Sequence, residues 1–108
     1  MKNTTLVIGA SLNPNRYSNI AIKRLIDRNI NTKAIGLRKG NIHTVTVETE
    51  KILFEGIDTV TLYLNPKRQE EYYNYILELS PRRVIFNPGT ENFEFIKLLK
   101  EKGVELEI

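Results

Sequence analysis

The loop after the first apolar run holds the residues best suited to chemistry. Gly9 ends that run, Ala10 follows it, and Arg16 lies further along the same loop. Small residues at the end of a strand let backbone amides approach a ligand, and the following helix presents the positive end of its dipole. Because a guanidinium neutralises phosphate oxygens, this arrangement is typical of a phosphate-binding site.

The same small residues also have a purely structural interpretation. They permit tight packing of a strand against a helix, and the segment from Gly9 to Pro14 contains one glycine only. It therefore lacks the G-x-G-x-x-G pattern that marks dinucleotide sites. The sequence leaves phosphate binding and tight packing as alternatives.

A second cationic group follows the next apolar run. An NAD site places a carboxylate at this point for the ribose diol, whereas this chain has Arg38 and Lys39 after Leu37. Two cations suit a phosphorylated ribose, such as a 2′- or 3′-phosphate, and disfavour plain NAD. A solvated basic turn explains the same residues equally well.

Two further segments follow apolar runs and carry amide side chains. They are Asn65-Pro66 and Asn87-Pro88-Gly89-Thr90-Glu91. Their polar groups would hydrogen-bond a pantetheine arm or a sugar. Each segment taken alone is also an ordinary turn former, and only their joint location beside the first loop favours a functional role.

The elements that must position these residues alternate between strand and helix patterns. Glycine or proline closes most of them, and residues 48–56 fit either a strand or a helical turn. The expected strands are 6–8, 32–37, 43–47, 58–64, 82–86 and 104–108. One expected helix follows Ser18 and Asn19, which are both common N-cap residues, and two others span 67–79 and 91–102.

This alternation predicts a single α/β domain over residues 1–108. We expect a doubly wound, mostly parallel, Rossmann-like sheet with helices on both faces. In such sheets ligands lie beyond the carboxyl ends of the strands, where the strand order reverses. The loops after the first, fourth and fifth expected strands should therefore line one crevice.

No catalytic set can be assembled from the chain. It has no cysteine and one histidine, His43, which excludes thiol nucleophiles, thiolate metal sites and multi-histidine centres. Asp58 begins a strand and Glu70-Glu71 has no carboxylate pair across a cleft, while Tyr72, Tyr73 and Tyr75 fit packing on a helix face. The residues therefore favour a binding module over an enzyme.

Composition excludes several other classes. The 108 residues are 41% hydrophobic and 27% charged, with 16 basic and 13 acidic residues and a net charge of +3, too mild for nucleic acid. The first apolar run is too short for a signal peptide or a membrane span, so we expect a cytoplasmic protein. Exposed sheet edges make a homodimer plausible.

The chain resembles the small stand-alone coenzyme A-binding proteins, a Rossmann-type family related to the nucleotide domain of succinyl-CoA synthetase alpha subunits. The resemblance runs through nearly the whole chain in order. The segments that carry it are Gly9-Ala10-Ser11, residues 13–19, Gly36-Leu37-Arg38, residues 58–63, Asn65-Pro66, residues 69–73 and residues 83–92.

This resemblance implies coenzyme A bound across the strand ends. The family pattern places the pyrophosphate at Gly9, Ala10, Ser11 and Arg16, the adenosine end near Arg38 and Lys39, and the pantetheine beside Asn65, Pro66, Asn87, Pro88 and Gly89. The same loops add Asn13, Pro14, Tyr17, Ser18 and Leu37 to the expected cofactor contacts.

The leading hypothesis is therefore a coenzyme A or acyl-CoA binding module without catalysis of its own. One alternative is an enzyme that depends on NADP or another nucleotide. Another is an interaction module that keeps the fold and has lost the ligand.

Overall fold

β1 (Thr4–Ala10) is the central strand of the sheet. Leu6, Val7 and Ile8 have no exposed surface, as expected for a strand covered on both faces. The strand pairs in parallel with β2 (Asn31–Gly36) on one side and with β5 (Ile57–Leu62) on the other. The structure is a computed structural model and describes residues 2–108.

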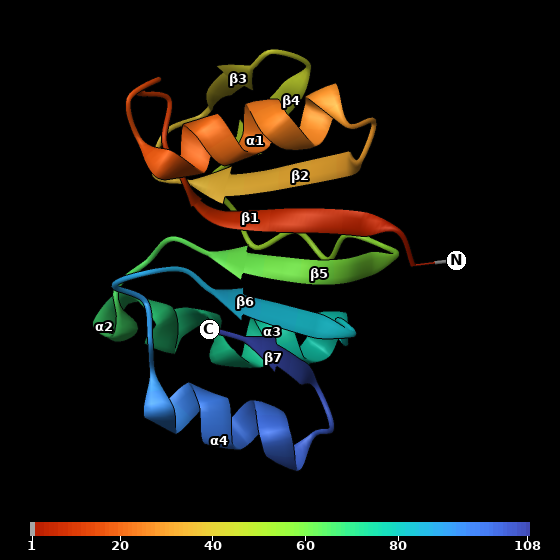
Figure 1. Cartoon of the computed structure of the whole chain (residues 1–108), viewed down its shortest axis with the longest axis vertical. Helices are drawn as coiled ribbons and strands as arrows, with labels where there is room; N and C mark the ends of the chain where they lie inside the picture. Colours follow the sequence, from red (N-terminus) through yellow and green to blue (C-terminus); the bar gives the residue numbers. More distant parts are fainter. Residues whose placement is uncertain (1) are drawn as a thin grey trace.

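The remaining strands extend the sheet on both sides of this centre (Figure 1). β4 (Val45–Glu48) pairs in parallel with β2, while β6 (Arg83–Phe86) and β7 (Glu105–Glu107) continue in parallel beyond β5. The order is β3-β4-β2-β1-β5-β6-β7, and it reverses direction between β1 and β5. The predicted mostly parallel, Rossmann-like α/β fold is confirmed.

The edge next to β4 differs from the prediction. Residues 43–47 were expected to form one short edge strand, but β3 (Gly40–Ile42) and β4 form an antiparallel hairpin. His43 lies in its turn with a φ of 51°. This turn separates β3 from β4, and β3 is therefore the edge strand of the sheet. Residues 49–54 are irregular and lead back across the sheet toward β5.

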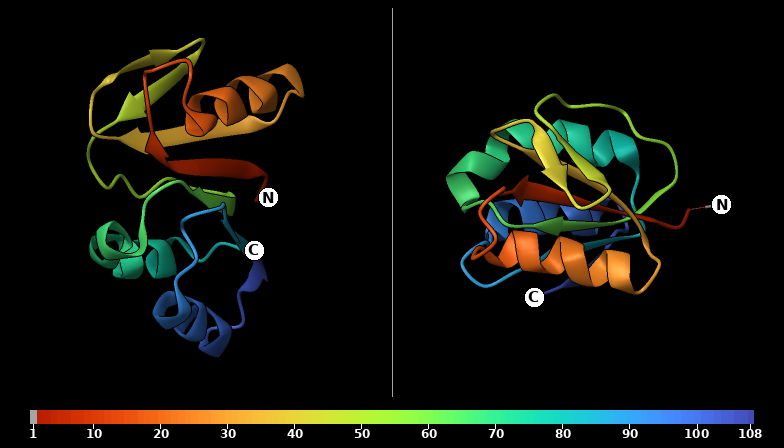
Figure 2. Two further views of the ribbon diagram at one scale, coloured as in Figure 1. Left: turned by 60° about the vertical axis from the view of Figure 1, so that its left-hand side comes forward. Right: turned by 90° about the horizontal axis from the view of Figure 1, so that it is seen from above.

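Helices cover both faces of the sheet, as predicted (Figure 2). Helix α1 (Tyr17–Asp27) packs on one face through Ile22, against Val7 and Ala34. On the other face α3 (Tyr73–Leu79) and α4 (Phe93–Glu101) form a second cluster, which includes the buried ring of Phe95. Within residues 2–108 no helix is both long and apolar enough to cross a bilayer.

The helix expected over residues 67–79 is interrupted. The structure has α2 (Pro66–Gln69), a 3₁₀ turn η1 (Glu70–Tyr72) and then α3. The two helical parts have different anchors, because Gln69 is bonded to carbonyls at the strand ends whereas Tyr75, Ile76 and Leu79 pack into the core. Periodicity alone does not show this division.

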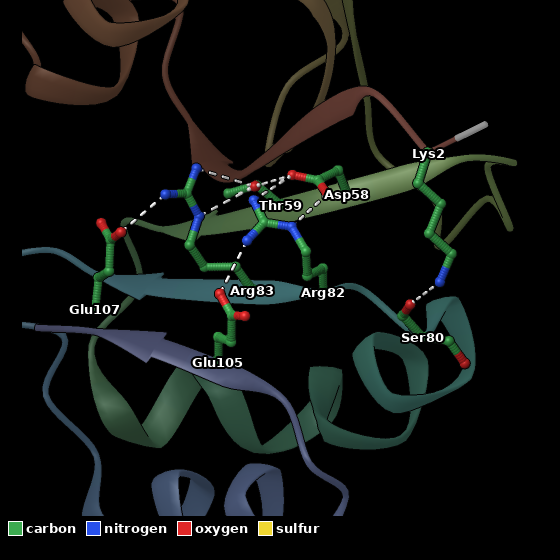
Figure 3. Close-up of polar contacts among 8 residues, drawn as sticks. All are labelled: Lys2, Asp58, Thr59, Ser80, Arg82, Arg83, Glu105 and Glu107. Carbon is green, nitrogen blue, oxygen red and sulfur yellow. Dashed lines mark hydrogen bonds and ion pairs between the residues drawn. The ribbon is translucent and has the colours of Figure 1, made fainter.

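An ion network joins β5, β6 and β7 near the amino ends of these strands (Figure 3). The Arg82 guanidinium donates to Asp58 through Nε (2.9 Å) and Nη2 (3.1 Å), and through Nη1 to Glu105 (2.9 Å). Beside it, Arg83 donates to Glu107 (2.8 Å) and to the Thr59 hydroxyl. The hydrogen bonds from Arg82 and Thr59 lower the pKa of Asp58.

We predict a pH-dependent contribution from this network. Replacing Asp58→Asn should lower stability at pH 7 by about 1 kcal/mol or less, as for other partly exposed ion pairs. Because the pKa of Asp58 is lower in the folded chain than the roughly 3.9 of an unfolded one, the stabilisation is full above the unfolded value and is lost as the pH falls through the folded value.

Thermal melts of both proteins between pH 7 and pH 2 test this expectation. The difference in Tm should be constant above about pH 4 and should shrink as the pH is lowered below that value. Glu50→Gln is a matched control, because Glu50 forms no ion pair within residues 2–108. A difference that stays constant over the whole range would contradict the role given to Asp58.

Candidate ligand-binding site

A cavity of about 450 Å³ opens at the carboxyl ends of β1, β2, β5 and β6. This volume lies in the range of small-molecule sites, and the position is the one where the strand order reverses. The exit loop of β2 contributes in addition to the three predicted loops. The lining residues are Gly9, Ala10, Ser11, Leu12, Arg16, Tyr17, Ser18, Gly36, Leu37, Arg38, Tyr63, Leu64, Arg68, Tyr72, Pro88 and Thr90.

Gly9 is required by its contact with a neighbouring strand exit. It lies at a register shift at the end of β1 and has a φ of 94°. A Cβ at this position would lie 2.9 Å from the Tyr63 carbonyl carbon and 3.1 Å from its oxygen. This contact supports tight packing at Gly9, although the packing is against a strand exit and not against the helix, and a phosphate contact at Gly9 stays a prediction.

The loop that follows Gly9 is held by side chains of the first helical turn. The Ser11 amide donates to Ser18 Oγ (3.1 Å), and Asn19 Nδ2 donates to the Ser11 carbonyl (2.9 Å). The predicted N-cap role of Ser18 and Asn19 is therefore wrong. The helix begins at Tyr17, and the N-cap residue Arg16 makes no side-chain cap hydrogen bond.

This arrangement leaves donors at the start of α1. The Ser11 amide donates to Ser18 in the first helical turn, and the amides of Asn13, Asn15 and Arg16 donate to oxygens of the loop. The amides in the first turn, at Tyr17 and Ser18, have no acceptor within residues 2–108. Helix N-termini with such amides attract anions.

Three arginines from three different elements line the cavity. Arg16 precedes α1, Arg38 follows β2, and Arg68 lies on α2. None of them has a carboxylate within 4.0 Å in the described part of the chain, and no aspartate or glutamate is among the lining residues. The cavity therefore carries uncompensated positive charge, which suits an anionic ligand.

Two lining tyrosines remain protonated at neutral pH. Burial raises the pKa of Tyr63, and burial together with the nearby Glu71 carboxylate raises the pKa of Tyr72. Their hydroxyl groups can donate hydrogen bonds but are poor bases. In residues 2–108 no cluster of three His, Cys, Asp or Glu side chains could hold a metal ion.

The structure brings nine of the sixteen sequence-predicted residues to the cavity wall. They are Gly9, Ala10, Ser11, Arg16, Tyr17, Ser18, Leu37, Arg38 and Pro88. The other seven, which do not line it, are Asn13, Pro14, Lys39, Asn65, Pro66, Asn87 and Gly89. The assignment of all sixteen as ligand contacts stays a prediction.

Most of the seven residues outside the wall interact with the protein itself. Lys39 pairs with Glu48 (3.6 Å), and Asn65 caps α2 by accepting from the Arg68 amide (3.0 Å).

Asn87 Nδ2 donates to the Thr61 hydroxyl (2.7 Å) and the Leu62 carbonyl (2.8 Å). Asn13 accepts from the Asn15 amide. The Gly89 amide donates to Glu91. Pro14 is exposed, and Pro66 occupies the first turn of α2.

The sixteen predicted contacts leave out seven lining residues: Leu12, Gly36, Tyr63, Leu64, Arg68, Tyr72 and Thr90. Thr90 lies in the segment 87–91, whose polar groups were expected to bind a pantetheine arm or a sugar. Gly36 ends its strand, and Tyr63 and Leu64 directly follow theirs, so the rule that ligands lie beyond strand ends was sufficient to find them. Arg68 could also have been predicted from the sequence, because a helix capped by Asn65 places Arg68 in the first turn after a strand exit.

Residues 3–107 match the model of a family of coenzyme A-binding domains. This chain belongs to that family. The resemblance inferred from the sequence motifs is thereby confirmed, and membership supports a coenzyme A-binding role in general. No curated protein matches the chain.

Solved structures agree with the family assignment. A protein described as uncharacterized is 45% identical, with a TM-score of 0.94 over 100% of this chain and 89% of that one. A hypothetical protein from Pyrococcus horikoshii OT3 is 26% identical, with a TM-score of 0.85 over 98% of this chain and 75% of that one. A conserved hypothetical protein from Pyrococcus furiosus, at 24% identity and a TM-score of 0.84, covers 97% of this chain and 91% of its own, and shows the same fold.

The packing at Gly9 can be tested against a second glycine with a similar backbone. Gly9 and Gly89 have φ values of 94° and 89°, but a Cβ at Gly89 would meet no atom within 4 Å. Both substitutions to alanine should incur backbone strain of about 1–3 kcal/mol. Gly9→Ala should cost about 1–3 kcal/mol more, because its Cβ overlaps the Tyr63 backbone. Urea unfolding measures both free energies, and equal costs would show that the contact with Tyr63 is unimportant.

Proposed function

We propose that this chain binds coenzyme A or an acyl-CoA and catalyses no reaction on it. The observation that carries the proposal is the cavity at the strand-order reversal, lined by Arg16, Arg38 and Arg68 with no carboxylate among the described lining residues. Coenzyme A is strongly anionic, with a diphosphate and a phosphorylated ribose. The charge of coenzyme A suits this cavity, and the family to which the chain belongs also supports coenzyme A as the ligand.

The diphosphate belongs at the start of α1 in this proposal. The amides of Tyr17 and Ser18 have no acceptor within residues 2–108, and the Arg16 side chain lines the same wall. Backbone donors, the helix dipole and a guanidinium then act on the same group. Gly9 contributes by keeping the end of β1 close to β5, so that the wall has this shape.

The ribose phosphate belongs at the exit of β2. Arg38 lines the cavity there, whereas the neighbouring Lys39 is paired with Glu48. Leu37 is 74% exposed and also lines the cavity, so it offers an apolar surface to an adenine ring. Arg38 alone is therefore assigned to the phosphate, and the side of the cavity formed by Tyr63, Leu64 and Tyr72 is left for the pantetheine arm.

The absence of catalysis is proposed from the chemistry of the wall. Within residues 2–108, its side chains include no carboxylate, imidazole, thiol or amine. The Ser18 hydroxyl accepts a hydrogen bond from the Ser11 amide and has no base beside it. A raised pKa keeps Tyr63 and Tyr72 protonated at neutral pH. Such a set can bind and orient a thioester but lacks a nucleophile–base pair to cleave it.

Calorimetric titration with coenzyme A and 3′-dephospho-coenzyme A tests the binding mode. The wild-type chain should bind coenzyme A more tightly, by roughly tenfold or more, because a charge-assisted hydrogen bond is worth about 1.5–3 kcal/mol. Arg38→Gln should remove this preference. Arg16→Gln should lower the affinity for both ligands by a similar factor, since both contain the diphosphate.

Lys39→Gln is the matched control for this experiment. It removes one positive charge from the position next to Arg38, but Lys39 is paired with Glu48 outside the cavity wall. The variant should keep the wild-type preference. No binding of coenzyme A at millimolar concentration would overturn the proposed function, and equal affinity of the wild type for both ligands would overturn the role of Arg38.

The lack of catalysis has its own test. Hydrolysis of acetyl-CoA would release a free thiol, and because the chain contains no cysteine, a thiol reagent detects only that product. We expect no thiol release above the rate in buffer at saturating acetyl-CoA and pH 7–8. Release that depends on protein concentration and disappears in Arg16→Gln would show that the cavity is an active site.

A further inference from the structure

The side chain of Gln69 is fully buried although its neighbours on α2 are exposed. Its Nε2 donates to the Leu64 carbonyl (2.8 Å) and to the Thr90 carbonyl (2.7 Å). Its Oε1 accepts from Asn92 Nδ2 (3.0 Å). Both donor hydrogens and the acceptor are therefore used, and the amide is fixed in one orientation.

The two carbonyls that Gln69 binds belong to different walls of the same cavity. Leu64 follows β5 and Thr90 follows β6, and both residues line the cavity. One side chain thus joins the exit loops of two adjacent parallel strands. Asn87 makes a related link closer to the sheet, where its amide binds the Leu62 carbonyl.

The amide of Gln69 is itself held from behind. Asn92 Nδ2 also donates to the Tyr73 hydroxyl (2.8 Å), and Asn92 Oδ1 accepts from the Phe95 amide at the start of α4 (3.2 Å). The Tyr73 ring stacks on Phe95, with centroids 4.4 Å apart. Rotation of the Gln69 side chain would break several buried hydrogen bonds at once, which is costly in a low-dielectric interior.

Gln69 also determines where a cavity arginine can lie. Arg68 is its neighbour on α2, and the Arg68 amide is bound by the Asn65 side chain. Because Gln69 directs one side of this short helix into the core, Arg68 is placed at the cavity wall. The helix has four residues and continues into the 3₁₀ turn, and the Gln69 hydrogen bonds fix it to the exit loops together with the Asn65 cap.

We propose that Gln69 is a positioning residue of the ligand site. It sets the separation of the loops after β5 and β6 and the placement of Arg68, so that the cavity has its binding shape before the ligand arrives. The inference rests on the proposed binding of coenzyme A, since it concerns the same cavity. A wall that is already ordered saves the cost of ordering it on binding.

The first test replaces Gln69→Met, which removes both donors with little change in volume. The Leu64 and Thr90 loops then sample other arrangements, and if the binding arrangement is populated to a tenth, the apparent affinity for coenzyme A falls about tenfold. Calorimetry is done well below the Tm of the variant, so that the folded protein is measured. A residue with a merely structural role would lower the Tm and leave this affinity unchanged.

Leu99→Ala is the control for loss of stability. Leu99 is fully buried in the core cluster that also contains Leu64, but it does not line the cavity. Its truncation should cost about 2–5 kcal/mol, comparable to leaving two buried carbonyls without donors. We expect a lower Tm and a coenzyme A affinity within about twofold of the wild type, in contrast to Gln69→Met.

A second variant gives a pH signature that depends on the proposed hydrogen bonds. In Gln69→Glu, a carboxylate would face the Leu64 and Thr90 carbonyls and could donate to neither, whereas the protonated acid can donate to one of them. Burial favours the neutral form and raises the pKa of this carboxyl. The affinity of the variant relative to the wild type at the same pH should therefore recover as the pH is lowered from 8 to 5.

The outcomes separate the two proposals. If the wild type binds coenzyme A and both variants bind it equally well at every pH, Gln69 has no positioning role while the proposed function survives. If Gln69→Met does not fold, the pH profile of Gln69→Glu decides, and a flat profile overturns the role. If the wild type itself does not bind coenzyme A, the proposed function fails first.

Discussion

The close approach of three strands at their carboxyl ends is the constraint on which the cavity depends. β1 meets β2 and β5 there, and both contacts leave no space for a side chain. A Cβ on Gly36 would overlap the Ala10 carbonyl oxygen, and one on Gly9 would press on the Tyr63 backbone. Because these two glycines have no side chain, the strand ends lie close together, and the exit loops surround one opening beyond them. This backbone geometry fixes the floor of the cavity at β1, and the polar side chains act on the loops around it.

Charge is then supplied from both faces of the sheet. Arg16 comes from the side of α1, while Arg68 comes from α2, which lies with α3 on the opposite face (Figure 2). Arg38 adds a third guanidinium at the exit of β2. Arg82 and Arg83, by contrast, belong to a network with acidic strand residues at the other end of the sheet. The three cavity arginines have no carboxylate within 4.0 Å among residues 2–108, so an anionic ligand would meet unpaired positive charge there.

Sequence alone predicted the fold class and the location of the cavity because both depend on strongly patterned elements. The run Leu6-Val7-Ile8 and the alternation of strands with helices determine a parallel sheet, and topology then places the exit loops together. Local details were less accessible. The hairpin at His43 depends on a turn with positive φ, and the break after Gln69 depends on hydrogen bonds to loops distant in sequence. Neither leaves a periodic signal.

The amide side chains at the strand ends show why the sequence alone does not tell a wall residue from a structural one. Asn65, Asn87 and Gln69 all follow strands and look alike as candidate ligand donors, yet each binds a backbone group of the protein. Loop backbones at the end of a parallel sheet expose amides and carbonyls that need partners when buried, and short amide side chains satisfy them. Arginines are longer and reach beyond this layer. At this cavity, therefore, the amides hold the loops behind the wall, and the guanidinium groups remain available to the ligand.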